Sequence, residues 1–95
     1  MKILIVDDHM IIRRGLVQIL DEFDGQYQSE QAADGVEAMQ KLRKGSFDAV
    51  LLDVALGERD GFDVLKSVRS EFPKLGVVML SVYPEAQFAL RAIRS

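Results

Sequence analysis

The chain has no cysteine among its 95 residues and no long apolar run. Without cysteine it can form neither disulfides nor zinc–thiolate sites and has no thiol nucleophile, a composition that suits a reducing compartment. No apolar run approaches the roughly 20 residues that a membrane-spanning helix requires. The first apolar stretch ends after four residues at Asp7, whereas the apolar segment of a secretion signal is longer. We therefore expect a cytoplasmic protein that does not contact membranes.

An excess of basic charge is also missing. The chain has 12 Lys and Arg residues against 15 Asp and Glu residues, and its net charge is −3. The basic residues are scattered, so nothing here resembles the positive patch of a nucleic-acid-binding surface. With 48% hydrophobic and 28% charged residues, the composition is that of an ordinary globular protein, and the length allows one domain.

Short apolar runs mark the predicted strands. Ile3–Val6, Ala49–Leu52 and Gly76–Leu80 are continuous rather than alternating, which is typical of strands buried on both faces. A weak alternation over Tyr27–Ala32 predicts a more exposed strand at a sheet edge. The segment Ala55–Gly61 is rich in turn residues, which predicts a loop.

Between these runs, apolar residues recur at helical spacing and predict four helices. Asp34 is placed to cap the second helix and Gly45 to end it, the third stops before Pro73, and the fourth begins near Pro84. The predicted inner residues are, in chain order, Ile12, Leu16, Ile19, Leu20 and Phe23; Val36, Met39 and Leu42; Leu65, Val68 and Phe72; and Ala86, Ala89, Leu90 and Ile93. Strict strand–helix alternation predicts an α/β fold with a doubly wound parallel sheet.

Polar side chains stand where the predicted strands end. Asp7 and Asp8 close the first run, Asp53 closes the third strand in chain order, and Ser81 follows the fourth. In a doubly wound sheet the carboxyl ends of neighbouring strands meet at the site. Carboxylates crowded there repel one another unless a cation or a proton lies among them. Oxygen ligands suit a hard cation such as Mg²⁺, beside which a carboxylate can attack phosphorus.

Each of these residues also has a simpler explanation when taken singly. Asp7 or Asp8 can serve as a helix N-cap, Asp53 as a solvated loop residue and Ser81 as a turn residue. His9 reads as an exposed loop histidine without a catalytic role. It is the joint spacing that favours a site.

The combination of motifs resembles a known family. The segments Lys2–His9, Phe47–Asp53, Asp60-Gly61 and Val77–Ser81 are similar to the receiver domain of two-component response regulators. Asp7-Asp8-His9 followed by Arg13–Leu16 most resembles the subfamily with a LuxR-type helix-turn-helix output domain. The resemblance implies a flavodoxin-like sheet with strand order 2-1-3-4. It also implies that phosphorylation switches the conformation and controls an output, such as transcription.

The resemblance also implies roles for individual residues. Asp53 matches the phosphoacceptor, which takes a phosphoryl group from a sensor histidine kinase. Asp8 and Asp53 match the side-chain ligands of Mg²⁺, the backbone carbonyl of Ala55 matches a third ligand, and Asp7 supports the ion through water. Ser81 matches the switch hydroxyl that closes onto the phosphoryl group. Such a domain is a signalling phosphoacceptor rather than an enzyme, beyond its own phosphorylation and dephosphorylation.

The chain departs from the family pattern in several places. Gly57 stands where a proline is usual, and Ala55 and Tyr83 occupy positions that tune access of the hydrolytic water. Residues 1–95 match a receiver domain that lacks its fifth strand, fifth helix, phosphoryl-binding lysine and output domain, and DNA contact is implied only through that output domain. We expect Val77–Leu80 to form an apolar edge strand, and the chain to dimerise or to be poorly stable.

Two other functions stay open from the sequence. The missing lysine favours a receiver-like interaction or dimerisation module that is not phosphorylated. A phosphatase with an aspartyl-phosphate intermediate fits less well, because that family places a second aspartate two positions after its nucleophile. Here that position is His9.

Overall fold

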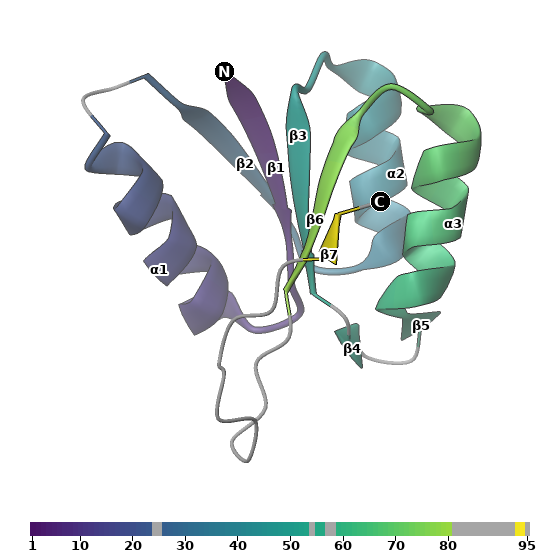
Figure 1. The fold of residues 1–95 in the computed structure, drawn as a ribbon. Coiled ribbons are helices and arrows are strands. Elements are labelled where there is room, and N and C mark those ends of the chain that lie inside the picture. Colours follow the sequence, from purple (N-terminus) through teal and green to yellow (C-terminus); the bar gives the residue numbers. More distant parts are fainter. Residues whose placement is uncertain (24–25, 54, 57–58, 81–92, 95) are drawn as a thin grey trace.

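The computed structural model describes residues 1–23, 26–53, 55–56, 59–80 and 93–94, and Figure 1 shows a sheet with helices on both faces. The strands are β1 (Lys2–Val6), β2 (Gln28–Ala32), β3 (Ala49–Asp53), β4 (Ala55–Leu56), β5 (Arg59–Asp60), β6 (Gly76–Leu80) and β7 (Ile93–Arg94). The helices are α1 (Met10–Asp21), α2 (Gly35–Lys44) and α3 (Gly61–Glu71). No helix in these ranges is long and apolar enough to cross a membrane.

The main sheet has the order β2-β1-β3-β6-β7, and the first four strands are parallel. The predicted order of four parallel strands is therefore confirmed. β1 lies between β2 and β3, and its residues Ile3 to Val6 are all buried, as its continuous apolar run predicts. The register pairs Val6 with Leu52, so the acidic residues that follow them emerge side by side.

The far edge of the sheet differs from the prediction. Ile93 was expected on the inner side of a helix, but it lies in β7, which pairs antiparallel with β6 through Val78 and Met79. The expectation of a free edge along β6 is therefore wrong at these two residues. At Val78 and Met79 the backbone of β6 pairs with β7, whereas the backbone groups of a free edge strand have no partner strand. The rest of the predicted last helix lies outside the described residues.

The hydrophobic core lies mainly on the side of the sheet that α2 and α3 cover (Figure 1). Along each strand alternate side chains point to this side. The core consists of buried residues from the strands and from both helices: Leu4, Val6, Ala32, Ala38, Met39, Leu42, Val50, Leu52, Val64, Val68, Val77 and Met79.

The opposite side of the sheet carries α1, which is much less buried. None of its residues is buried, and Ile19 has an exposed fraction of 52%. Phe23, just beyond the helix, is also exposed, so the predicted inner stripe is wrong for both residues. Ile12, Leu16 and Leu20 are half-buried. α1 is the one described helix on this side of the sheet. It therefore packs against the sheet only, whereas α2 and α3 each have the sheet and the other helix as neighbours.

The ends of α2 follow the prediction, but its inner face does not. The backbone N–H of Glu37 donates to Asp34 Oδ1 at 2.8 Å, so Asp34 caps the helix, and Gly45 ends it. Val36 was expected to point inward but has an exposed fraction of 58%. The small residues Gly35 and Ala38 are buried instead, together with Met39 and Leu42, at the i, i+3, i+4, i+7 spacing of a helix face.

α3 begins at Gly61 and ends at Glu71, before Pro73 as predicted. Val64 and Val68 are its buried side chains, while Leu65 and Phe72 are half-buried against the core. The segment predicted as a loop contains two short strands, β4 and β5, which pair antiparallel.

α2 and α3 are joined by an ion pair at the surface. Arg43 donates to Glu71 through Nε at 2.9 Å and through Nη2 at 2.5 Å. This contact lowers the pKa of Glu71, first through the hydrogen bond from Arg43. Both side chains are exposed, so the pair contributes little to stability.

Candidate functional site

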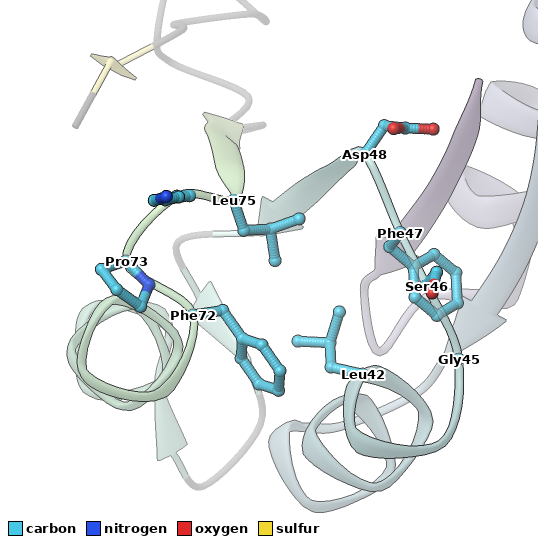
Figure 2. Close-up of a pocket in the computed structure, with 9 residues that line it drawn as sticks. Leu42, Gly45, Ser46, Phe47, Asp48, Phe72, Pro73 and Leu75 are labelled. Atoms are coloured by element: carbon cyan, nitrogen blue, oxygen red, sulfur yellow. The ribbon is translucent and has the colours of Figure 1, made fainter.

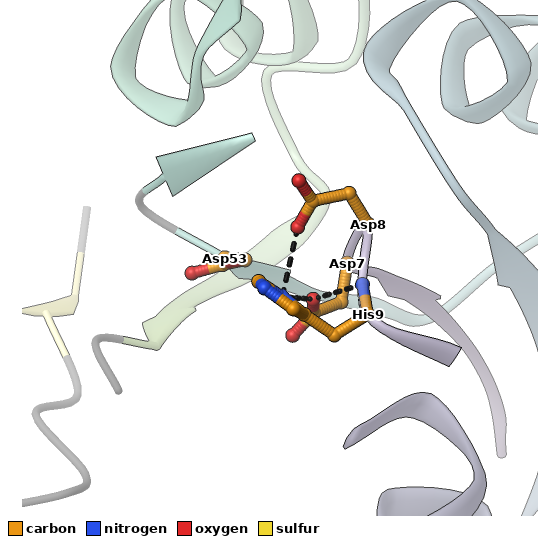
Figure 3. Close-up of side chains that lie close together, drawn as sticks. All are labelled: Asp7, Asp8, His9 and Asp53. Carbon is orange, nitrogen blue, oxygen red and sulfur yellow. Dashed lines mark hydrogen bonds and ion pairs between the residues drawn. The ribbon is translucent and has the colours of Figure 1, made fainter. Parts of the chain in front are cut away.

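The predicted acidic residues meet at the carboxyl ends of β1 and β3 (Figure 3). Asp7 follows β1 directly, and Asp53 is the last residue of β3. The backbone N–H of Asp7 donates to the carbonyl of Ala32 at 3.1 Å, which ties the start of the loop to the end of β2. Parallel pairing of the central strands thus brings together residues that lie 46 positions apart in sequence.

The cluster contains Asp7, Asp8, His9 and Asp53. Each offers one ligand atom, and these atoms all lie within 4.8 Å of one another. Asp7 and Asp53 are buried, with exposed fractions of 3% and 6%, whereas Asp8 and His9 lie at the surface. A cation can therefore approach from solvent on the side of Asp8 and His9.

Hydrogen bonds within the cluster orient Asp7. Its Oδ1 accepts from the backbone N–H of His9 at 2.8 Å and lies 2.9 Å from His9 Nδ1. His9 Nδ1 also lies 2.9 Å from Asp8 Oδ1. The N-cap position of α1 is occupied by His9, whose own side chain makes no capping hydrogen bond. Neither Asp7 nor Asp8 therefore occupies the N-cap position that the simpler explanation assigned to them.

His9 is a member of this cluster that was not predicted from the sequence. It was expected to be an exposed loop histidine; it is exposed, and its ring also lies against two carboxylates (Figure 3). These contacts raise the pKa of His9 above its ordinary 6.5, first through the hydrogen bond with Asp7 and then through the charge of Asp8.

We expect the pKa of His9 to be raised in the metal-free protein. Because the folded-state pKa is the higher one, protonated His9 stabilises the fold fully below about pH 6.5, the unfolded value. That contribution is lost as the pH rises through the folded-state value. His9 is the sole histidine, so an NMR pH titration of its ring protons measures the pKa directly.

Asp7→Asn is the matched variant for this titration. It removes the negative charge from the first partner of His9 and leaves Asp8 in place, so the pKa of His9 should fall back toward 6.5. An ordinary pKa in the unmodified protein, or the same raised pKa in Asp7→Asn, would contradict the contact with Asp7.

Arg13 is a second residue whose role at this site the sequence reasoning missed. It lies in the second turn of α1 and is half-buried. Its Nη1 donates to the backbone carbonyl of Asp7, and its Nε donates to Gln31 Oε1 at 3.0 Å. No local pattern in the sequence points to this role, because it depends on contacts with residues of two other elements, Asp7 and Gln31.

Of the remaining predicted site residues, only Ala55 is among those that the structure describes, and it is not a member of the cluster. Ala55 begins β4, two residues after Asp53. Ser81 follows β6 but lies outside the described residues, as do Gly57 and Tyr83. The structure therefore brings together Asp7, Asp8 and Asp53 of the predicted set.

A pocket of about 510 Å³ lies at the other end of the sheet (Figure 2). Leu42, Phe47, Phe72 and Leu75 line it, at the ends of α2 and α3 and before β3 and β6. These are the amino ends of the strands, opposite the carboxylate cluster. The pocket is mainly apolar and contains none of the residues that we singled out for chemistry.

The geometry of the cluster limits what it can do. Carboxylate oxygens held this close are suited to a hard divalent cation, because such an ion offsets their mutual repulsion. A buried carboxylate at the end of a central strand can also act as a nucleophile once that repulsion is offset.

Comparison with known proteins agrees with this arrangement. Residues 3–95 match the family described as the response regulator receiver domain. The transcriptional regulatory protein YhcZ of Bacillus subtilis is 30% identical over 95 residues, which are 100% of this chain and 44% of YhcZ. The chain thus spans less than half the length of that relative.

Solved structures show the same fold. The response regulator TrrA of Thermotoga maritima, in complex with Mg²⁺-BeF, is 30% identical and aligns with a TM-score of 0.79 over 90% of this chain and 73% of that chain. A complex of the histidine kinase ThkA with TrrA aligns with a TM-score of 0.78 at 30% identity, over 92% of this chain and 73% of that one.

Proposed function

Because this chain belongs to the response regulator receiver domains, we propose that it accepts a phosphoryl group on Asp53 in a Mg²⁺-dependent reaction. The observation that carries the proposal is the meeting of Asp7, Asp8 and Asp53 at one end of the sheet, with ligand atoms within 4.8 Å of one another. The Mg²⁺-BeF complex of TrrA supports the same chemistry for this chain.

In this proposal each acidic residue has a distinct task. Asp8 and Asp53 would hold Mg²⁺ through their side chains, the backbone carbonyl of Ala55 would be a third ligand, and Asp7 would act through a bound water. The donor set fits the ion, because Mg²⁺ prefers oxygen ligands and keeps several waters. When bound, Mg²⁺ supplies positive charge that offsets the repulsion between the carboxylates and an incoming phosphoryl group.

The transfer itself is a displacement at phosphorus. A carboxylate oxygen of Asp53 forms the new bond to phosphorus while the bond to the leaving group breaks, and the leaving group keeps the electron pair. The product is an aspartyl phosphate. Burial of Asp53 beside β1 limits the directions from which water reaches that product.

The donor we propose is a phosphohistidine on a sensor histidine kinase, which the ThkA complex with TrrA supports. Ser81 would then close onto the phosphoryl group, and the region after β6 would reorganise around the added charge. The readout we propose is control of an output, such as transcription, in the cytoplasm of the cell, supported by the name of YhcZ.

The test is intact-mass measurement after incubation with acetyl phosphate and Mg²⁺. We expect a single phosphoryl adduct that forms with Mg²⁺ and is absent when EDTA removes the ion. If the folded protein binds Mg²⁺ and still forms no adduct, phosphotransfer to this chain is refuted. The interaction module that is not phosphorylated would then explain the chain better.

A further inference from the structure

We propose that Arg13 is a positioning residue that holds the Asp7–Asp8 peptide, and through it the Asp8 carboxylate, in the cluster. The inference rests on the proposed function in one respect, namely that the cluster binds a divalent cation. Nothing in the family assignment above gives Arg13 this role. The contacts of its guanidinium carry the argument.

The guanidinium is held at two points. Nη1 donates to the carbonyl of Asp7, and Nε donates to Gln31 Oε1 at 3.0 Å. Gln31 is itself fixed, because it pairs with Ile5 in the sheet and its carbonyl accepts from Lys41 Nζ. Two bonds from different nitrogens of a planar group determine its orientation, which a single bond does not.

The carbonyl of Asp7 belongs to the same planar peptide as the nitrogen of Asp8. Fixing that oxygen therefore fixes the plane from which the Asp8 side chain departs. The other side of Asp7 is already held by the bond from its N–H to the carbonyl of Ala32. On the carbonyl side Arg13 donates to the oxygen itself, and the bond from the His9 N–H to Asp7 Oδ1 closes the turn around the same peptide.

The charge of Arg13 and its positioning contacts predict opposite effects of its removal on the affinity for Mg²⁺. A positive side chain near a cation site repels the cation, so loss of charge alone should tighten Mg²⁺ binding. Loss of positioning should weaken it, because Asp8 leaves its place beside Asp53. The sign of the change in Mg²⁺ affinity therefore separates the two effects.

The experiment compares Arg13→Gln with Arg14→Gln by calorimetric titration of the full chain with Mg²⁺. Both changes remove one positive charge from neighbouring positions of α1, but Arg14 is exposed. We expect Arg13→Gln to weaken Mg²⁺ binding about tenfold, the lower end of the effect of losing a group that orients a metal ligand. Arg14→Gln should leave the affinity almost unchanged. Equal or tighter binding by Arg13→Gln would overturn the proposal.

Arg13→Lys separates charge from geometry. Lysine keeps the positive charge but cannot reproduce the two bonds of the planar guanidinium. The Arg13→Lys variant should therefore bind Mg²⁺ more weakly than the unmodified protein. If the lysine variant instead binds Mg²⁺ with unchanged affinity, positioning through the two contacts is refuted. Thermal unfolding without Mg²⁺ shows whether each variant is folded.

A second readout needs no metal. The backbone amide resonances of Asp8 and His9 should move in Arg13→Gln and stay in place in Arg14→Gln. If the unmodified protein binds no Mg²⁺, the proposed metal site fails, yet these resonances still decide the role of Arg13. Unchanged resonances of Asp8 and His9 in Arg13→Gln would overturn it.

Discussion

Asp53→Asn is expected to abolish the phosphoryl adduct that the unmodified chain forms with acetyl phosphate and Mg²⁺. Asparagine has the shape of aspartate but no negative oxygen, so it is not a nucleophile toward phosphorus. The change also removes one of the proposed ligands of the ion. Intact-mass measurement should show no adduct above background, while circular dichroism shows the variant to be folded.

Asp63→Asn is the matched control, since Asp63 is an exposed aspartate in the first turn of α3, outside the carboxylate cluster. It should form the adduct as the unmodified chain does. An undiminished adduct in Asp53→Asn would place the phosphoryl group on another residue. Treatment with alkali would then distinguish an acyl phosphate on Asp7 or Asp8, which alkali cleaves, from a phosphoramidate on His9, which survives it.

Leu52→Ala is expected to lower the free energy of unfolding by about 3 kcal/mol, within the range measured for fully buried leucines. Leu52 has an exposed fraction of 0% and lies in the core that α2 and α3 cover. The truncation removes its contacts and leaves a cavity between the sheet and these helices. For a domain whose total stability is on the order of 5–15 kcal/mol, the loss is large.

Leu51→Ala provides the control on the same strand. The neighbouring side chain points to the opposite side of the sheet and is half-buried, so the same truncation should lower the free energy of unfolding by about 1 kcal/mol. Urea unfolding, followed by circular dichroism, measures both. Equal losses in the two variants would contradict the unequal burial of the two sides.

The sequence predicted the main features of the sheet because they depend on local pattern. Continuous apolar runs show which strands are buried on both faces, and alternation with helices requires parallel strands. Placing Asp7 beside Asp53 then needs only the parallel pairing of β1 with β3. Asp34 and Gly45 were predictable as helix ends for the same reason, because capping depends on neighbours in sequence.

The features that were missed depend on contacts between distant segments. Val36 fits the apolar spacing of α2, but the sheet admits the smaller Gly35 and Ala38. Ile93 fits a helix pattern, yet pairing with the edge of β6 determines its conformation. The contacts of Arg13 with Asp7 and Gln31 join α1 to the ends of two strands, and no local pattern encodes such a bridge.

The sparse burial of α1 has a thermodynamic consequence. A helix with no buried residue is held mainly by its contact with the sheet, so it can open at lower free energy than the sheet with α2 and α3. The loop that carries Asp8 and His9 leads directly into this helix. A cation held across Asp8 and Asp53, as proposed, would bind only the closed form, so its binding would raise the free energy of opening by mass action. The bound ion would thereby link α1, the part of the chain that opens first, to the central sheet, the part that opens last.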